Sequence, residues 1–171
     1  MAATPTLYLE SSIVSYLAAH PSRDLIVAAH QQVTKEWWDQ ARERFVVYTS
    51  EAVVDEITAG DPDAAARRVS FITGIPSLAL TNEVKVLARA YQEKLGLPSK
   101  AFLDSVHLAY AVAYQMDYLL TWNCAHLANG IVISRLQIIN RAEGRNTPVI
   151  VTPEELLELP EGDYDVERSD R

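Results

Sequence analysis

The sequence has a single cysteine, Cys124, and only six glycines, which are scattered singly along 171 residues. One cysteine cannot form an internal disulfide, which fits a reducing cytoplasm, and we expect Cys124 to be a small buried residue. The isolated glycines exclude a phosphate-cradling loop and a dinucleotide fingerprint. The longest apolar run, Leu108–Tyr114, is too short for a transmembrane helix, and residues 1–6 lack the basic start and apolar core of a signal peptide.

Basic residues are also scarce. Lys and Arg number 15 against 23 Asp and Glu, so the formal net charge is −8. This excludes binding of nucleic acid by bulk electrostatics, and any phosphate chemistry needs local cations or metal ions. The composition is otherwise that of one globular domain, 49% hydrophobic. We expect the domain to cover residues 1–159 and to be followed by a flexible acidic tail, residues 160–171.

Short apolar runs alternate with segments of helical periodicity. Five runs are predicted strands: Thr6–Glu10, Phe45–Thr49, Ile75–Leu80, Tyr118–Thr121 and Val149–Val151. Apolar residues three and four positions apart predict helices over residues 26–41 and 84–95. Asp61-Pro62 predicts the start of a helix to residue 72, and a capping box at Thr152 predicts a last short helix. This alternation is typical of an α/β fold in which helices cover both faces of a parallel sheet.

Ligands of such sheets bind beyond the carboxyl ends of the strands, and we expect four polar residues to converge there. Glu10 follows the first predicted strand directly, Glu56 follows the second by about two helical turns, and Asn123 follows the fourth. Asp104 lies on a predicted helix and shares a face with Lys100 and His107. Hard oxygen ligands suit Mg²⁺ or Mn²⁺. Two carboxylates without a metal repel by ~4 kcal/mol at about 4 Å and an effective dielectric constant of about 20, which itself favours a cation.

Each of these residues also has a purely structural interpretation. Glu10 and Asn123 are suited to helix capping. Asp55 competes with Glu56 for the position that faces the site, and Asp104 would otherwise be a solvated helix residue.

Four neighbouring residues are candidate phosphate or substrate contacts: Ser11, Lys100, His107 and His126. Capping of the first helix is the alternative for Ser11. A hydrogen-bonded, partly buried position is an equal alternative for each histidine.

Four motifs carry a resemblance to a known family: YLESSI at Tyr8–Ile13, VVDEI at Val53–Ile57, LDSVHLA at Leu103–Ala109 and LLTWN at Leu119–Asn123. In order, spacing and placement they resemble the PIN-domain ribonucleases, specifically the VapC-like toxins of type II toxin–antitoxin pairs. The resemblance covers about residues 6–157. It implies a PIN-like three-layer α/β/α fold with a central five-stranded parallel sheet.

The resemblance also implies a function, an endoribonuclease that hydrolyses RNA through water activated by Mg²⁺ or Mn²⁺. The family's four acidic positions, catalytic and metal-binding, fall on Glu10, Glu56, Asp104 and Asn123. Two of them depart from the usual Asp: Glu10 is one methylene longer, and Asn123 removes one negative charge.

The implied partners are RNA, a small antitoxin protein and a second copy of the chain, with no membrane and a cytoplasmic location. Apolar residues Trp37, Trp38 and Phe45 also favour a homodimer. The two departures support an alternative hypothesis, a catalytically weakened PIN-like scaffold that acts through protein or RNA binding. A third, an unrelated doubly wound enzyme of small molecules, predicts that Asp104 and Glu56 lie far apart.

Overall fold

A five-stranded parallel sheet runs through the centre of the protein, in the order β3-β2-β1-β4-β5. The structure is a computed structural model and describes residues 3–158. The strands are β1 (Thr6–Leu9), β2 (Val46–Ser50), β3 (Ser77–Leu78), β4 (Tyr118–Leu120) and β5 (Val149–Val151). In the central strands the side chains of Leu7, Leu9 and Leu119 are fully buried. Burial on both faces is what a parallel sheet between two helix layers requires.

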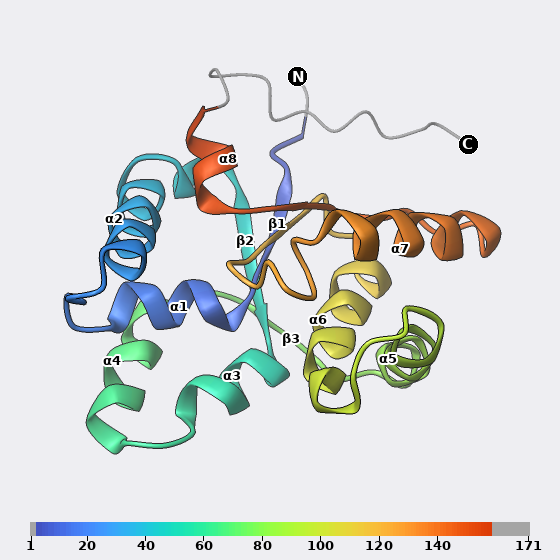
Figure 1. Cartoon of the computed structure of the whole chain (residues 1–171), viewed down its shortest axis with the longest axis horizontal. Coiled ribbons are helices and arrows are strands. Elements are labelled where there is room, and N and C mark those ends of the chain that lie inside the picture. Colours follow the sequence, from blue (N-terminus) through green and yellow to red (C-terminus); the bar gives the residue numbers. More distant parts are fainter. Residues whose placement is uncertain (1–2, 159–171) are drawn as a thin grey trace.

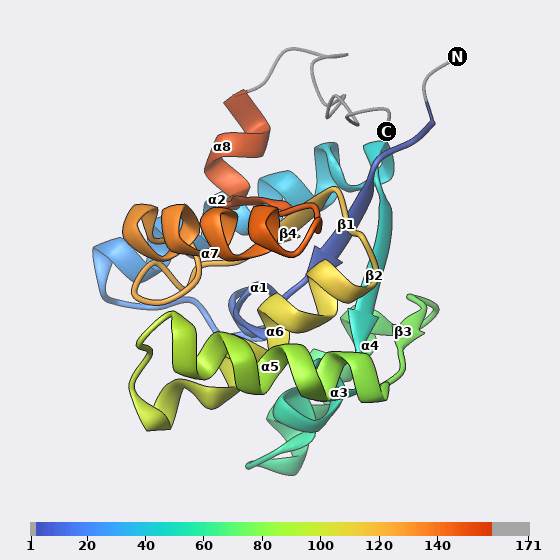
Figure 2. The same ribbon diagram turned by 90° about the vertical axis from the view of Figure 1, so that its right-hand side faces the viewer.

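The helices form two layers, which Figure 1 shows on either side of β1 and β2. One layer holds α1 (Ser11–Ala18), α2 (Leu25–Gln40), α3 (Glu51–Thr58), α4 (Pro62–Ile72) and α8 (Pro153–Glu158). The other layer, which faces the viewer in Figure 2, holds α5 (Asn82–Lys94), α6 (Phe102–Ala113) and α7 (Gly130–Ala142). Two short 3₁₀ turns, Arg42–Arg44 and Ser99–Ala101, precede β2 and α6. The predicted α/β class and five-stranded parallel sheet are therefore confirmed.

Local capping explains where several helices begin. Asp61 Oδ1 accepts the Ala64 amide at 2.8 Å at the start of α4, as predicted from Asp61-Pro62. At the start of α8 the Glu155 carboxylate accepts the Thr152 amide at 2.7 Å, the reciprocal half of the predicted capping box. The helix after β4 is α7, and Asn129 caps it rather than Asn123.

Three expectations about single residues or segments are wrong. Cys124 is exposed rather than buried, because it lies in the turn that follows β4. Trp37 and Phe45 are buried in this chain's own core, 0% and 6% exposed, so neither offers surface to a second copy. The predicted strand Ile75–Leu80 shrinks to two residues at the edge of the sheet, since Pro76 has no amide proton to pair.

The acidic tail expected over residues 160–171 lies outside the described residues. Within residues 3–158, no helix has both the length and the apolarity that a membrane span needs.

Candidate metal centre

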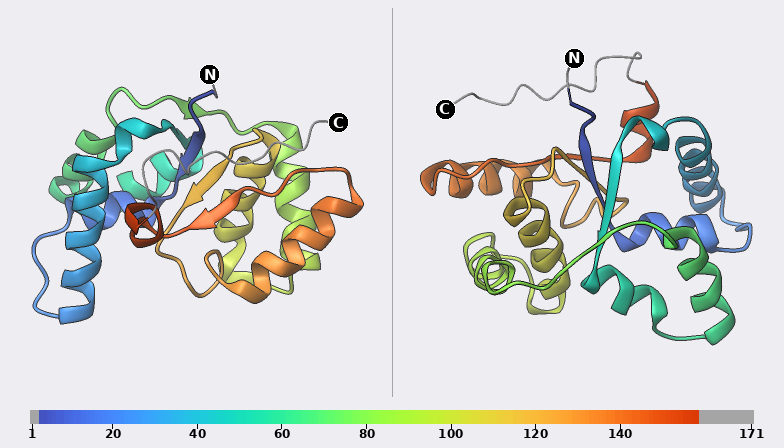
Figure 3. Two further views of the ribbon diagram at one scale, coloured as in Figure 1. Left: turned by 90° about the horizontal axis from the view of Figure 1, so that it is seen from above. Right: turned by 180° about the vertical axis from the view of Figure 1, so that it is seen from behind.

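The candidate site lies where the direction of chain winding reverses. From β1 the chain crosses to β2 and then β3, whereas from β4 it crosses to β5 on the other side, so β1 and β4 are the neighbours at the switch point. Both views of Figure 3 show the strands between their helices. Glu10 follows β1 directly, and Thr121 follows β4. Crevices at such switch points are the usual ligand sites of open α/β sheets.

The carboxylate of Glu10 is 5% exposed and held from several directions. Its Oε2 contacts the Ser12 hydroxyl and accepts a hydrogen bond from the Thr121 hydroxyl at 2.7 Å. Its Oε1 accepts the Ser12 amide at 3.1 Å, which caps α1, and the Ser11 hydroxyl at 2.6 Å. The capping interpretation of Glu10 is therefore confirmed, and the same carboxylate also faces the other acidic residues.

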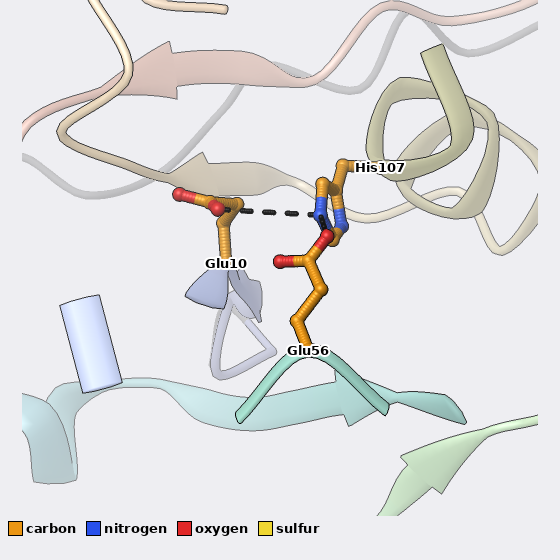
Figure 4. A group of neighbouring side chains, drawn as sticks. All are labelled: Glu10, Glu56 and His107. Atoms are coloured by element: carbon orange, nitrogen blue, oxygen red, sulfur yellow. Dashed lines mark hydrogen bonds and ion pairs between the residues drawn. The ribbon is translucent and has the colours of Figure 1, made fainter. Parts of the chain in front are cut away.

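Glu56, rather than the exposed Asp55, points from α3 toward Glu10 (Figure 4). Its Oε1 lies 3.1 Å from Nε2 of His107 on α6, and its Oε2 contacts the Ser11 hydroxyl. The same His107 nitrogen lies 4.0 Å from Glu10 Oε1. One atom from each of Glu10, Glu56 and His107 lies within 4.8 Å of the other two, so these side chains form a compact group from three elements.

Charges within this group shift pKa values in opposite directions. Burial by itself raises the pKa of Glu56, but hydrogen bonds from His107 and Ser11 and the charge of His107 outweigh it, and the pKa is lowered. Burial by itself lowers the pKa of His107, but its bond to Glu56 and the charges of Glu10, Glu56 and Asp104 outweigh it, and the pKa is raised. Both shifts favour a charged pair.

The donor set of the group fits a hard divalent cation. Ser11 Oγ contacts one carboxylate oxygen of Glu10 and one of Glu56, yet a hydroxyl has a single proton and donates to only one of them. When both carboxylates are ionised, the other carboxylate oxygen faces the same hydroxyl without a proton between them. A cation bound by the two carboxylates would remove this repulsion, and such all-oxygen ligands suit Mg²⁺ or Mn²⁺.

Asp104 and Asn123 belong to a second group, together with His126. Asn123 Nδ2 donates to Asp104 Oδ1 at 2.9 Å, and His126 Nδ1 lies 2.7 Å from Asp104 Oδ2. The Asn123 carbonyl accepts the His126 amide at 3.1 Å, so Asn123 caps the turn after β4. The Thr121 hydroxyl joins the two groups, because it donates to Glu10 and accepts the Asn123 amide at 2.9 Å.

The candidate substrate contacts differ in their positions. Ser11 is buried between the two glutamates, and Lys100 is exposed on the 3₁₀ turn before α6. His107 is 1% exposed and its ring nitrogens face Tyr8 and Glu56, so it belongs to the interior of the site and not to a substrate surface. The His126 side chain is 29% exposed, and substrate contact stays a prediction for it.

Sequence reasoning missed Tyr8 and Thr121. Tyr8 is fully buried in β1, and its hydroxyl lies 2.8 Å from His107 Nδ1. A tyrosine within a buried strand is typical of the core, so no local signal distinguishes it. Thr121 ends a predicted strand at the same edge of the sheet as Glu10, and this position alone could have marked Thr121 as a site residue.

The chain resembles a known protein in its fold but not in its sequence. No family model matches the sequence, and no curated protein matches it. Among solved structures, one match is a chain in the crystal structure of VapBC2 from Rickettsia felis bound to a DNA fragment from their promoter. The two chains share 12% identity at a TM-score of 0.55, and the match covers 86% of this chain and 98% of that chain. This likeness shows that the chain has a VapC-like PIN-domain fold, as the motifs predicted.

Proposed function

We propose that the protein is a divalent-metal-dependent endoribonuclease of the PIN/VapC type. The observation that carries the proposal is the convergence of Glu10 and Glu56 on one serine hydroxyl at the switch point of a VapC-like fold. Carboxylates placed this way hold Mg²⁺ or Mn²⁺, the cations that support hydrolysis of phosphodiester bonds. The net charge of −8 also supports a metal, because an acidic protein repels phosphate unless a cation offsets the repulsion.

In the proposed mechanism Glu10 and Glu56 hold the cation, which when bound lowers the pKa of a water molecule and stabilises charge at phosphorus. The protein's own contribution is orientation. Ser12 and Thr121 fix one oxygen of Glu10, and His107 fixes one oxygen of Glu56. Asp104 and Asn123 act from the neighbouring group, which the Thr121 hydroxyl joins to Glu10.

The test is cleavage of a panel of fluorogenic RNAs with Mg²⁺ or Mn²⁺, with EDTA as the negative control. Glu56→Gln should lower metal-dependent cleavage at least about 100-fold, because it removes a ligand charge. The matched control is Glu93→Gln, the same substitution at an exposed position of α5, which should cleave like the wild type. Equal metal-dependent cleavage by Glu56→Gln and the wild type would overturn the proposal. Asp104→Asn tests the second group in the same assay.

We further propose that the chain is the toxin of a toxin–antitoxin pair in the cytoplasm. Support comes from the fold it shares with a VapBC2 chain. A small protein encoded next to it should co-purify with it and suppress the RNA cleavage described above. Cleavage that is unchanged in the presence of that protein would contradict the pairing.

A homodimer is the proposed assembly, and a groove between α3, α5 and α6 is its proposed interface. The groove has a volume of about 600 Å³, and its lining includes the apolar residues Leu80, Phe102 and Leu103. These three side chains are 42–49% exposed. Its walls carry opposite charges: Glu51, Asp55 and Glu56 come from α3, and Lys85 and Arg89 come from α5. A two-fold axis through the groove would place the acidic wall of each copy against the basic wall of the other.

Sedimentation velocity at tens of micromolar protein tests the dimer. Arg89→Glu should shift the wild-type dimer toward monomer, and adding Asp55→Arg to it should restore association. Arg141→Glu, on the exposed side of α7, is the control and should leave the dimer intact. A wild-type monomer at these concentrations would reject the assembly.

The scaffold alternative is supported by one observation, the pairing of both Asp104 oxygens with Asn123 and His126. If that pairing holds in solution, Asp104 is not free to bind a metal. A protein with no saturable Mn²⁺ site at millimolar metal would act by binding instead.

A further inference from the structure

A line of buried hydrogen bonds leads from β2 through β1 and α6 to Glu56. Ser50 Oγ lies 2.8 Å from the Tyr8 hydroxyl, which lies 2.8 Å from Nδ1 of His107. The opposite nitrogen of His107, Nε2, lies 3.1 Å from Glu56 Oε1. Ser50 and Tyr8 are fully buried and His107 is 1% exposed, so solvent does not compete for these bonds.

The bond between Ser50 and Tyr8 can run in either direction. Ser50 caps α3, and its oxygen accepts the Val53 amide at 3.2 Å, so its hydroxyl proton is free to point at Tyr8. When Ser50 donates, Tyr8 accepts from it and donates its own proton to Nδ1 of His107. A neutral imidazole that accepts at Nδ1 carries its proton on Nε2, which faces the Glu56 carboxylate.

The reverse arrangement of a neutral His107 is disfavoured. A proton on Nδ1 would leave the lone pair of Nε2 against a carboxylate oxygen at 3.1 Å, two acceptors in contact. If His107 is instead fully protonated, both nitrogens carry protons and Tyr8 donates to Ser50. In either charge state Nε2 is an N–H donor to Glu56, so the conclusion does not depend on the titration of His107.

We infer that Tyr8 is a positioning residue: it holds His107 as an N–H donor to Glu56 and so keeps His107 out of the metal's ligand set. The metal is then held by carboxylate oxygens alone, although the compact group includes an imidazole. Metal-bound residues are commonly oriented by such outer partners, and loss of one typically weakens metal binding about 10–100-fold. The inference rests on the proposed metal-dependent function, which it deepens.

The direct test is a long-range ¹⁵N–¹H NMR spectrum of the imidazoles, recorded without metal and with the diamagnetic ion Mg²⁺. His107→Gln assigns the His107 signals among the four histidines of the chain. We expect Nε2 of His107 to have the shift of a protonated nitrogen in both samples. An unprotonated Nε2, or an Nε2 signal that changes to that of a metal-bound nitrogen with Mg²⁺, would overturn the inference.

Tyr8→Phe tests the role of Tyr8 itself, because it removes only the hydroxyl. We expect the ¹⁵N signal of Nδ1 to shift, because this nitrogen loses the hydroxyl that it bonds to, and Mn²⁺ binding to be about 10-fold weaker by calorimetry. Tyr110→Phe is the matched control: Tyr110 stacks on Tyr8 with ring centroids 6.1 Å apart, and its buried hydroxyl bonds to no described side chain. It should keep the wild-type spectrum and affinity. A Tyr8→Phe protein with both unchanged would contradict the inference.

The two proposals fail separately. If the wild type does not cleave RNA but His107 gives the expected spectrum, the proposed nuclease activity is overturned. The inference that Tyr8 positions His107 is then unaffected. If Tyr8→Phe does not fold, the wild-type spectrum without and with Mg²⁺ still decides whether Nε2 is a donor or a ligand.

Discussion

Asn123 donates a side-chain hydrogen bond to Asp104, from Nδ2 to Oδ1 at 2.9 Å, across 19 residues of sequence. The amide nitrogen therefore occupies the place where an aspartate would set a second negative charge against Asp104. With His126 on the other oxygen, both oxygens of Asp104 have protein hydrogen-bond partners, and the group is compatible with the absence of a cation. Asn123 therefore determines whether the stability of this group depends on a bound metal ion.

Asn123→Asp should make the protein depend on metal. Without metal, the free energy of unfolding should fall by about 1–3 kcal/mol, because a partly buried hydrogen bond is lost and two carboxylates come into contact. Mn²⁺ should recover most of this loss by binding between them. Thermal or urea unfolding in EDTA and in Mn²⁺ measures both effects.

Asn129→Asp is the control for this prediction. Asn129 caps α7, where aspartate is an equally good cap, so its stability should be nearly unchanged in either condition. Equal effects of the two substitutions in EDTA would mean that the contact with Asp104 is unimportant.

Ser11→Ala should destabilise the metal-free site in a similar range. The Ser11 hydroxyl contacts both Glu10 and Glu56, and a hydrogen bond to a charged group contributes about 1.5–3 kcal/mol. Unfolding in EDTA measures the loss, and Ser15→Ala, at an exposed position of α1, is the control. If Ser11→Ala is as stable as Ser15→Ala, the hydroxyl does not separate the two carboxylates in solution.

The pair of Glu56 and His107 predicts how stability depends on pH in EDTA. The pKa of Glu56 is lowered from 4.5, so its contribution is present above that pH and lost as the pH falls through the lower folded value. The pKa of His107 is raised from 6.5, so its contribution is present below that pH and lost as the pH rises through the higher folded value. The pair should therefore stabilise the fold most between pH 4.5 and 6.5.

The measurement is the difference in Tm between the wild type and His107→Gln across this range and up to about pH 9. Glutamine keeps an N–H donor near Glu56 but cannot become charged. The difference should be largest between the two pKa limits and should shrink on the alkaline side. A difference that stays constant from acid to alkaline pH would contradict a charged pair.

The sequence predicted the architecture well because its signals are local. Alternating strands and helices and caps such as Asp61 depend on neighbouring residues, and the structure confirms them. The choice between Asp55 and Glu56 was harder, because it depends on the rotation of α3 against β1. The division of four expected residues into two groups could not be predicted, since it depends on side-chain contacts such as that of Asn123 with Asp104.

The same limit explains the incorrect expectations. Trp37 and Phe45 are large apolar residues whose sequence neighbours do not show whether they face the chain's own core or a partner. Tyr8 looks like any buried strand residue, and only the tertiary contact with His107 shows its polar role. Features set by contacts between distant segments need the structure.

The central claim is that Glu10 and Glu56 form a divalent metal centre, and Mn²⁺ calorimetry on three proteins tests it most directly. The wild type and the control Glu93→Gln should show one saturable site of equal affinity, whereas Glu56→Gln should bind at least about 10-fold more weakly. A wild type without a saturable site, or a Glu56→Gln protein that binds Mn²⁺ as tightly as the wild type, would contradict the account.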